Sequence, residues 1–141
     1  MHLSRITQAA RLEKSCDMDN LLLSGLGHTW IIDLDGTIVA HNGYKLDGKD
    51  TFLPGAFDFL NSIPRQDMIV FVTSRMDDHK SLTEKFLREN GVRYDHIIFN
   101  APFGERILIN DDKPSGLPMA IAVRKKRNDK VMIHVDIDST V

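Results

Sequence analysis

The sequence predicts an α/β protein with a parallel sheet that helices cover on both faces. From residue 29 onward, short apolar runs rich in β-branched residues alternate with segments of helical spacing. Such alternation is typical of right-handed crossovers between parallel strands. The runs are almost continuously apolar, as expected of strands buried on both faces. A chain of 141 residues is long enough for one domain with a substantial core.

Each element has its own signal. Strands are expected where the apolar runs are short, at residues 29–32, 68–72, 96–99 and 106–109. A helix is expected from Pro54 to residue 63, because proline suits a first helical turn. A second helix is expected over 81–90, where Gly91 supplies a stop. Residues 38–51 are polar, with glycines at 43 and 48, and are expected to form a loop or a small hairpin.

The two ends of the chain differ from this pattern. Residues 1–27 have rough helical spacing and predict an N-terminal helical arm, which either packs on the domain or binds a partner. The domain itself is expected to cover residues 28–141. Within it, 119–123 and 131–137 resemble strands joined by the turn signal Asn128-Asp129, which predicts a C-terminal antiparallel hairpin appended to the sheet.

Composition restricts the classes of function. The net charge of −2 argues against a general nucleic-acid binder. The basic run Arg124–Arg127 either reads an acidic polymer or nucleotide, or forms a charged hairpin tip that blocks edge pairing. The single cysteine, Cys16, excludes an internal disulfide and a cysteine-built zinc site. Because no long apolar span or signal peptide stands out, we expect a cytoplasmic protein with no membrane partner.

Two carboxylates follow the first predicted strand. Asp33 and Asp35 lie two residues apart, so their side chains could converge on one spot. Two anions at that distance repel each other unless a cation or a shared proton intervenes, and Mg2+ prefers such oxygen ligands. A turn signal at Asp35-Gly36, or a helix cap, would explain Asp35 but does not explain why Asp33 stands at the end of a buried strand.

Polar residues also follow two other strands. Thr73, Ser74 and Arg75 come after the second strand, and Asn110, Asp111, Asp112 and Lys113 after the strand expected at 106–109. Ligands of open α/β sheets bind beyond the carboxyl ends of the strands. Carboxylates, hydroxyls and bases at that edge suit a divalent metal and a phosphate dianion. A carboxylate can then attack phosphorus, a second can move the proton, and a base can offset the developing charge.

These segments resemble three motifs of the haloacid dehalogenase (HAD) superfamily of phosphatases: Asp33-Leu34-Asp35-Gly36-Thr37, Val72-Thr73-Ser74-Arg75 and Ile109-Asn110-Asp111-Asp112. The resemblance covers about residues 28–113 and implies a Rossmann-like domain with Mg2+-dependent phosphoryl transfer. It makes Asp33 the nucleophile and Asp35 the general acid/base. Phosphate would bind at Thr73, with Ser74 and Arg75 beside it. The metal would be held by Asp33, Asp35, Asp111 and Asp112.

The chain departs from the family pattern in two ways. Ala101 stands where the family's third motif has a basic residue, and Arg106, Lys80 or Lys113 could supply that charge instead. Lys80 is as readily explained by a solvated helix face, and Lys113 by pairing with the adjacent carboxylates. The chain also has no room for a large cap domain, so the site would be open to a large substrate or a partner.

The sequence thus predicts a capless Mg2+-dependent phosphomonoester hydrolase acting through an aspartyl-phosphate intermediate. Its substrate would be a phosphorylated small molecule, a sugar phosphate or a nucleotide. The alternative is a catalytically weak phosphate- or nucleotide-binding module, or a partner-docking module, of the same fold. Contacts in a homo-oligomer could complete the open site.

Overall fold

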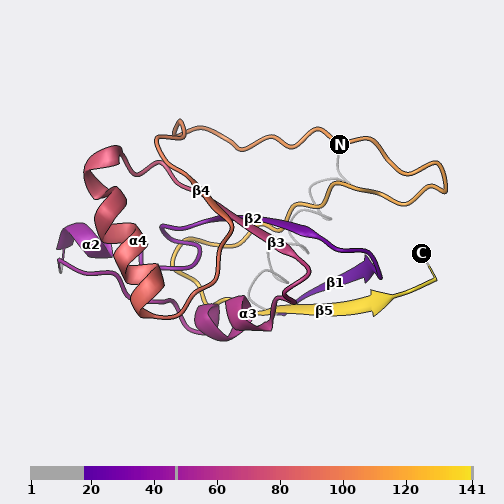
Figure 1. Ribbon diagram of the computed structural model, residues 1–141, viewed down its shortest axis with the longest axis horizontal. Coiled ribbons are helices and arrows are strands. Elements are labelled where there is room, and N and C mark those ends of the chain that lie inside the picture. Colours follow the sequence, from indigo (N-terminus) through magenta and orange to yellow (C-terminus); the bar gives the residue numbers. More distant parts are fainter. Residues whose placement is uncertain (1–17, 47, 141) are drawn as a thin grey trace, which may run out of the picture.

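The computed structural model describes residues 18–46 and 48–140 and has a mixed α/β architecture with parallel strands. The strands are β1 (Asp19–Ser24), β2 (Thr29–Asp33), β3 (Met68–Val72), β4 (His96–Ile98) and β5 (Ile133–Asp138). The helices are α2 (Gly43–Leu46), α3 (Ala56–Ser62), the 3-10 turn η1 (Asp77–His79) and α4 (Lys80–Glu89). Figure 1 shows α2 and α4 at one end of the molecule and the β1–β5 pair at the other. The α/β prediction is confirmed at this level.

The central sheet has the order β2-β3-β4, with all strands parallel. Its register pairs Asp33 with Val72 and Val72 with Ile98, so the three strands end side by side. Strand β3 coincides with the predicted run 68–72, and β2 and β4 differ from prediction by one residue each. The carboxyl ends that were expected to carry polar residues therefore share one edge of the sheet.

The core lies around this sheet and is made largely of aliphatic and phenyl side chains. Phe71, Leu34, Ile38 and Ile69 are at most 1% exposed. Helix α4 contributes Leu87, and α3 contributes Phe59 and Leu60. Both helices were predicted, and their bounds differ from the prediction by one or two residues at each end.

A second, separate sheet pairs β1 with β5 in parallel, from Asp19 beside Ile133 to Ser24 beside Asp138. The predicted antiparallel hairpin of 119–123 with 131–137 is therefore wrong. Asn128 does adopt a turn, with φ 64°, but residues 119–123 form no strand and β5 takes a partner from the start of the chain. The helical prediction also fails over Asp19–Ser24, which form a strand in which Leu22 is exposed and the next residue, Leu23, is buried. The remainder of that arm, residues 1–17, lies outside the described residues.

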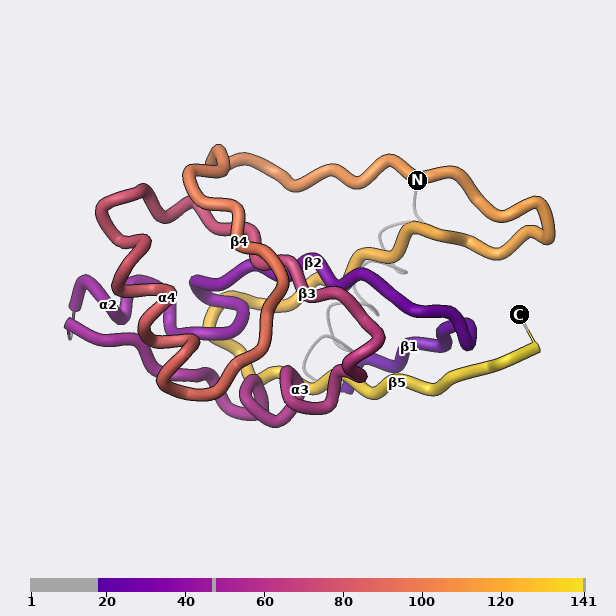
Figure 2. The backbone as a smooth tube through the Cα atoms, viewed as in Figure 1, coloured from indigo at the N-terminus to yellow at the C-terminus, as the bar shows by residue number. Residues whose placement is uncertain are grey.

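The strand expected at 106–109 does not form. After β4 the chain leaves the sheet as a long extended excursion, which runs in orange across the top of Figure 2 before it returns toward β5. Ile107 and Ile109 are 83% and 90% exposed on it. The apolar pattern is that of a strand, but a strand also needs a neighbour to pair with, and residues 18–46 and 48–140 supply none for this segment.

Among the described residues, no helix combines the length and apolar character that crossing a bilayer requires.

Candidate active site

Asp33 lies at the end of β2, where the chain turns sharply. The loop is closed by hydrogen bonds from the backbone amides of Ile38 and Val39 to the carbonyl of Leu34. Gly36, with φ 79°, occupies a left-handed position that suits glycine. The loop folds the Thr37 hydroxyl back so that it donates to Oδ2 of Asp33 at 2.8 Å. The Asp33 side chain remains 36% exposed, so a ligand can reach it.

Arg106 joins Asp33 to the end of the neighbouring strand. Its Nη1 lies 3.3 Å from Oδ1 of Asp33, and its Nη2 donates to Oγ of Ser74 at 3.2 Å. The Arg106 side chain is 38% exposed, so this ion pair is open to solvent. The structure therefore brings together the predicted residues Asp33, Ser74 and Arg106: a carboxylate, a hydroxyl and a guanidinium.

Asp35, in contrast, is bound by Arg75. Nε and Nη2 of Arg75 donate to the two carboxylate oxygens of Asp35 at 3.0 and 2.8 Å. The same guanidinium donates to both oxygens of Asp50, at 3.0 and 2.7 Å, and to the Thr83 hydroxyl at 2.8 Å. The Tyr44 ring lies 4.1 Å from the guanidinium carbon. All the N–H donors of the Arg75 guanidinium are therefore bonded within the protein, and none is available to bind a phosphate.

This cluster is buried. The Arg75 side chain is 1% exposed, and those of Asp50 and Asp35 are 2% and 18% exposed. Burial alone would lower the pKa of Arg75, but the hydrogen bonds that it donates to Asp35 and Asp50, together with their negative charges, outweigh burial and raise that pKa. The arginine is therefore permanently charged, as a buried partner of two carboxylates must be. Sequence reasoning missed Asp50 and Thr83. Asp50 lies in the polar loop 38–51, where nothing in the pattern distinguishes it.

Thr73 is placed differently from the prediction. It is 1% exposed, and its Oγ1 accepts a hydrogen bond from the backbone amide of Arg75 at 3.1 Å. Its carbonyl accepts from the amide of Ala101 at 3.1 Å. In this arrangement Thr73 shapes the turn after β3, and the exposed hydroxyl at the sheet edge belongs to Ser74.

The expected metal ligands do not come together. Asp111 and Asp112 lie exposed on the extended excursion, and within the described ranges no group of three His, Cys, Asp or Glu side chains is arranged to hold a metal ion. Lys113 is exposed on the same excursion, in a turn closed by its own backbone. Lys80 lies 6.0 Å from the Phe99 ring. Since both oxygens of Asp35 are held by Arg75, the residues present do not fit a magnesium ion in this arrangement.

The basic run does not form the predicted hairpin tip. The turn at residues 124–130 packs against the loop after Asp35, where the Asn128 amide donates to the Gly36 carbonyl at 2.9 Å. Lys125 Nζ donates to the carbonyls of Gly36 and Asp129 at 3.2 and 2.7 Å. Burial lowers the pKa of the Lys125 amine, and the charge of Asp129 opposes this only in part. No sequence signal linked these segments, which lie about 90 residues apart.

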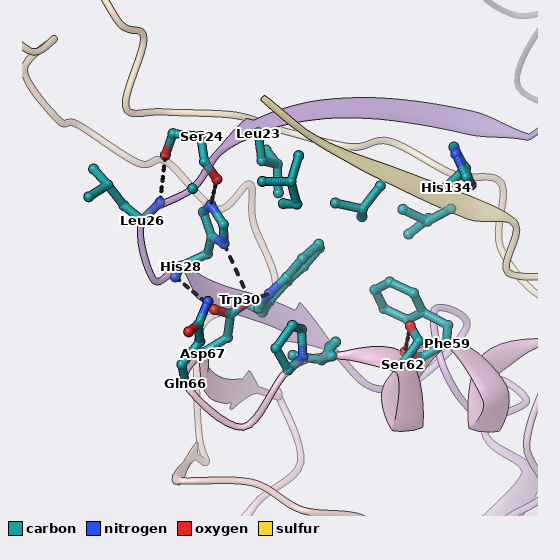
Figure 3. Close-up of a pocket in the computed structure, with 16 residues that line it drawn as sticks. Leu23, Ser24, Leu26, His28, Trp30, Phe59, Ser62, Gln66, Asp67 and His134 are labelled. Carbon is teal, nitrogen blue, oxygen red and sulfur yellow. Dashed lines mark hydrogen bonds and ion pairs between the residues drawn. The ribbon is translucent and has the colours of Figure 1, made fainter. Parts of the chain in front are cut away.

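A cavity of about 390 Å³ lies between the β1–β5 pair and the layer formed by β2 and α3 (Figure 3). At its edge the buried carboxylate of Asp67 accepts hydrogen bonds from Trp30 Nε1 at 3.0 Å and from the His28 amide at 3.0 Å. The His28 ring lies between Oδ2 of Asp67, at 3.3 Å, and the Ser24 carbonyl, at 3.1 Å. Figure 3 shows this network linking the end of β1 to the start of β2. Its contacts join the two sheets, away from Asp33.

Comparison of the chain with protein-family models, with curated proteins and with solved structures finds no match.

Proposed function

We propose that the protein is a phosphomonoester hydrolase in which Asp33 is the nucleophile. The observation that carries this proposal is the meeting of Asp33, Arg106 and Ser74 at the carboxyl ends of β2 and β3. A carboxylate that is one-third exposed, held by one hydroxyl and faced by one guanidinium is oriented for attack on an electrophile. The resemblance of its motif to HAD phosphatases, with their Rossmann-like domain, supports phosphorus as that electrophile.

The reaction would proceed in two displacements. An Asp33 oxygen attacks the phosphorus, the bond from phosphorus to the ester oxygen breaks, and the alcohol leaves with a proton taken from solvent or a nearby donor. Water then attacks the phosphorus of the aspartyl phosphate, which releases inorganic phosphate and restores the carboxylate. Arg106 would offset the charge on the phosphoryl oxygens, as a basic side chain does in related chemistry. The Ser74 hydroxyl, which donates to the Pro102 carbonyl at 3.3 Å in this structure, would turn its proton to the same group.

Asp35 would support the reaction indirectly in this arrangement. With both oxygens held by Arg75, it fixes the loop that carries Asp33 and Thr37. To act as general acid it would have to leave that guanidinium. Substrates with good leaving groups, which need no proton at departure, should therefore be favoured.

Magnesium enters the proposal as a separate expectation. For Asp111 to approach Asp33, the segment 107–110 would have to move while Arg106 stays beside Asp33. The edge of β2 away from β3 has no strand beside it among the described residues, and it exposes Ile31 at 55%. Ile107 and Ile109, exposed in this structure, would become partly buried if the segment were added there as a parallel strand.

The experiment is hydrolysis of an aryl phosphate by the purified protein, with and without Mg2+. We expect turnover that Asp33→Asn abolishes and Arg106→Ala lowers at least about tenfold. Lys113→Ala is the matched control, since Lys113 lies outside this group, and it should leave the rate within about twofold. Full activity of Asp33→Asn would refute the nucleophile. Phosphate binding without turnover, on a broad panel of esters, would favour the alternative of a phosphate-binding module.

A further inference from the structure

The turn at residues 124–130 holds basic side chains beside the loop that carries the proposed nucleophile. It is fixed there from several directions. The Asn128 amide and Lys125 Nζ donate to the Gly36 carbonyl, and the His41 amide donates to Oδ1 of Asn128 at 2.7 Å. Asn128 holds a left-handed conformation, with φ 64°. The position of this turn against the loop is therefore built by specific contacts and does not depend on charge alone.

Arg127 lies closest to the loop. A Cβ built on Gly36 would lie 3.0 Å from Cγ of Arg127, so the aliphatic stem of this arginine packs on the glycine. Gly36 directly precedes Thr37, whose hydroxyl is bound to Asp33. The stem of Arg127 is thus anchored one residue away from a side chain that touches the proposed nucleophile.

The guanidinium of Arg127 is free to bind a ligand. Arg75 uses its donors on Asp35, Asp50 and Thr83, and Arg106 is shared between Asp33 and Ser74. Arg127 is exposed, and its side chain makes no hydrogen bond or ion pair in the part of the chain that the structure describes. A guanidinium presents a planar fork that fits a carboxylate or a phosphate with two parallel hydrogen bonds.

We propose that Arg127 binds a second anionic group on the substrate, so that the favoured esters carry a carboxylate or a further phosphate on their leaving group. This inference rests on the proposed function of Asp33. Asp33, Asp35 and Asp50 repel an anionic substrate, and Arg75 is already committed to two of them. Arg127, whose stem packs on Gly36, adds a positive charge beside the loop that carries Asp33.

The test compares substrates matched in size but not in charge. Glycerol 3-phosphate has an uncharged hydroxymethyl group at the position where 3-phosphoglycerate has a carboxylate. Fructose 6-phosphate and fructose 1,6-bisphosphate test a second phosphate in the same way. We expect Arg127→Gln to raise KM at least about tenfold for the doubly anionic member of one pair, with kcat within twofold. KM for the other member should stay unchanged, and Arg127→Lys should recover part of the loss.

Arg124→Gln is the matched control, because it removes the same charge from the same turn without touching Gly36. It should change KM less than twofold for every substrate. If Arg124→Gln and Arg127→Gln act alike, or if Arg127→Gln affects both members of each pair equally, the anion site is refuted. The thermal midpoint of Arg127→Gln should equal that of the wild type, since no bond within the described chain is lost.

Calorimetric binding of 3-phosphoglycerate and fructose 1,6-bisphosphate separates this inference from the proposed function. Binding that Arg127→Gln weakens, in a protein without turnover, would refute the hydrolase and support the anion site. Turnover with equal KM for the singly and doubly anionic substrates would support the hydrolase and refute the anion site. Absence of both turnover and binding would overturn both.

Discussion

The buried cluster around Arg75 makes the sharpest prediction on stability. Arg75→Met keeps most of the side-chain volume but removes a charge that faces two carboxylates, one of them only 2% exposed. Breaking a buried pair by removing one partner costs about 3–5 kcal/mol, because the remaining charge is left uncompensated. Asp35, at 18% exposure, can regain some water, so we expect a loss near the lower end, about 3 kcal/mol. For a chain of this length that corresponds to a fall in Tm of roughly 10 °C.

The assay is urea unfolding followed by fluorescence and circular dichroism, with coincident transitions as the check on two-state behaviour. Asp50→Asn should cost about 1–2 kcal/mol, since the amide oxygen still accepts one of the two hydrogen bonds from Arg75 while the amide nitrogen faces the other donor. The double variant should be less destabilised than the sum of the two single variants by about 2 kcal/mol, because the stranded carboxylate is gone. Lys85→Met is the control: its pair with Glu89 is 3.9 Å long and about two-thirds exposed, so it should change stability by less than about 0.5 kcal/mol. A loss below about 1 kcal/mol for Arg75→Met would refute the reasoning.

Three further predictions concern other parts of the molecule. Gly55→Ala should lower the free energy of unfolding by about 2–4 kcal/mol, because φ of Gly55 is 81° and an added Cβ would meet the Val131 carbonyl oxygen. Gly91→Ala is the control, since φ of Gly91 is 69° but no atom lies within 4 Å of an added Cβ. It should lower the free energy of unfolding by only about 1 kcal/mol in the same urea assay. Burial would raise the pKa of Asp67, but hydrogen bonds from Trp30 and His28 outweigh it, so this pKa is lowered. The stabilisation by Asp67 is therefore complete above its unfolded pKa of about 4 and is lost as pH falls through the lower folded value. In urea titrations at several pH values, Asp67→Asn should make the free energy of unfolding fall less steeply with acid. A fall as steep as that of the exposed control Asp112→Asn would contradict the assignment. Finally, Mg2+ should slow amide hydrogen exchange over residues 107–109 if that segment pairs with β2. Exchange that is unchanged at millimolar Mg2+ would refute the proposed movement of this segment.

The parts of the fold that were predicted correctly have local causes. Residues 68–72 are five consecutive apolar residues bounded by polar ones, and they form β3 without any shift. Pro54 and Gly91 delimit α3 and α4 to within two residues, because the fixed φ of proline and the access of glycine to positive φ act wherever these residues occur. The polar ends of β2 and β3 meet because parallel strands in register end together.

The failures have long-range causes. Residues 133–138 have the pattern of a strand, but only the whole fold determines that β1, more than 100 residues earlier, becomes its partner. Similarly, Asp35 was predicted to transfer protons, and only the structure reveals that Asp35 and Asp50, which lies in the polar loop, both pair with Arg75. Residues 106–109 show the reverse case, an apolar pattern for which the structure supplies no neighbour.

Two arginines with the same chemistry, Arg75 and Arg106, acquire different roles from their surroundings. Arg75 is enclosed by carboxylates, so it fixes the loop and is unavailable to a ligand. Arg106, in an exposed pair with Asp33, can exchange that partner for a phosphoryl group at little cost, since exposed pairs contribute at most about 1 kcal/mol. The backbone amide of Ala101 donates a hydrogen bond to the carbonyl of Thr73, whereas the guanidinium of Arg106, five residues later in the chain, contacts Asp33. The absence of a basic residue at position 101 therefore does not deprive the site of a cation, and the exchangeable pair at Arg106 is where we expect the chemistry to depend on charge.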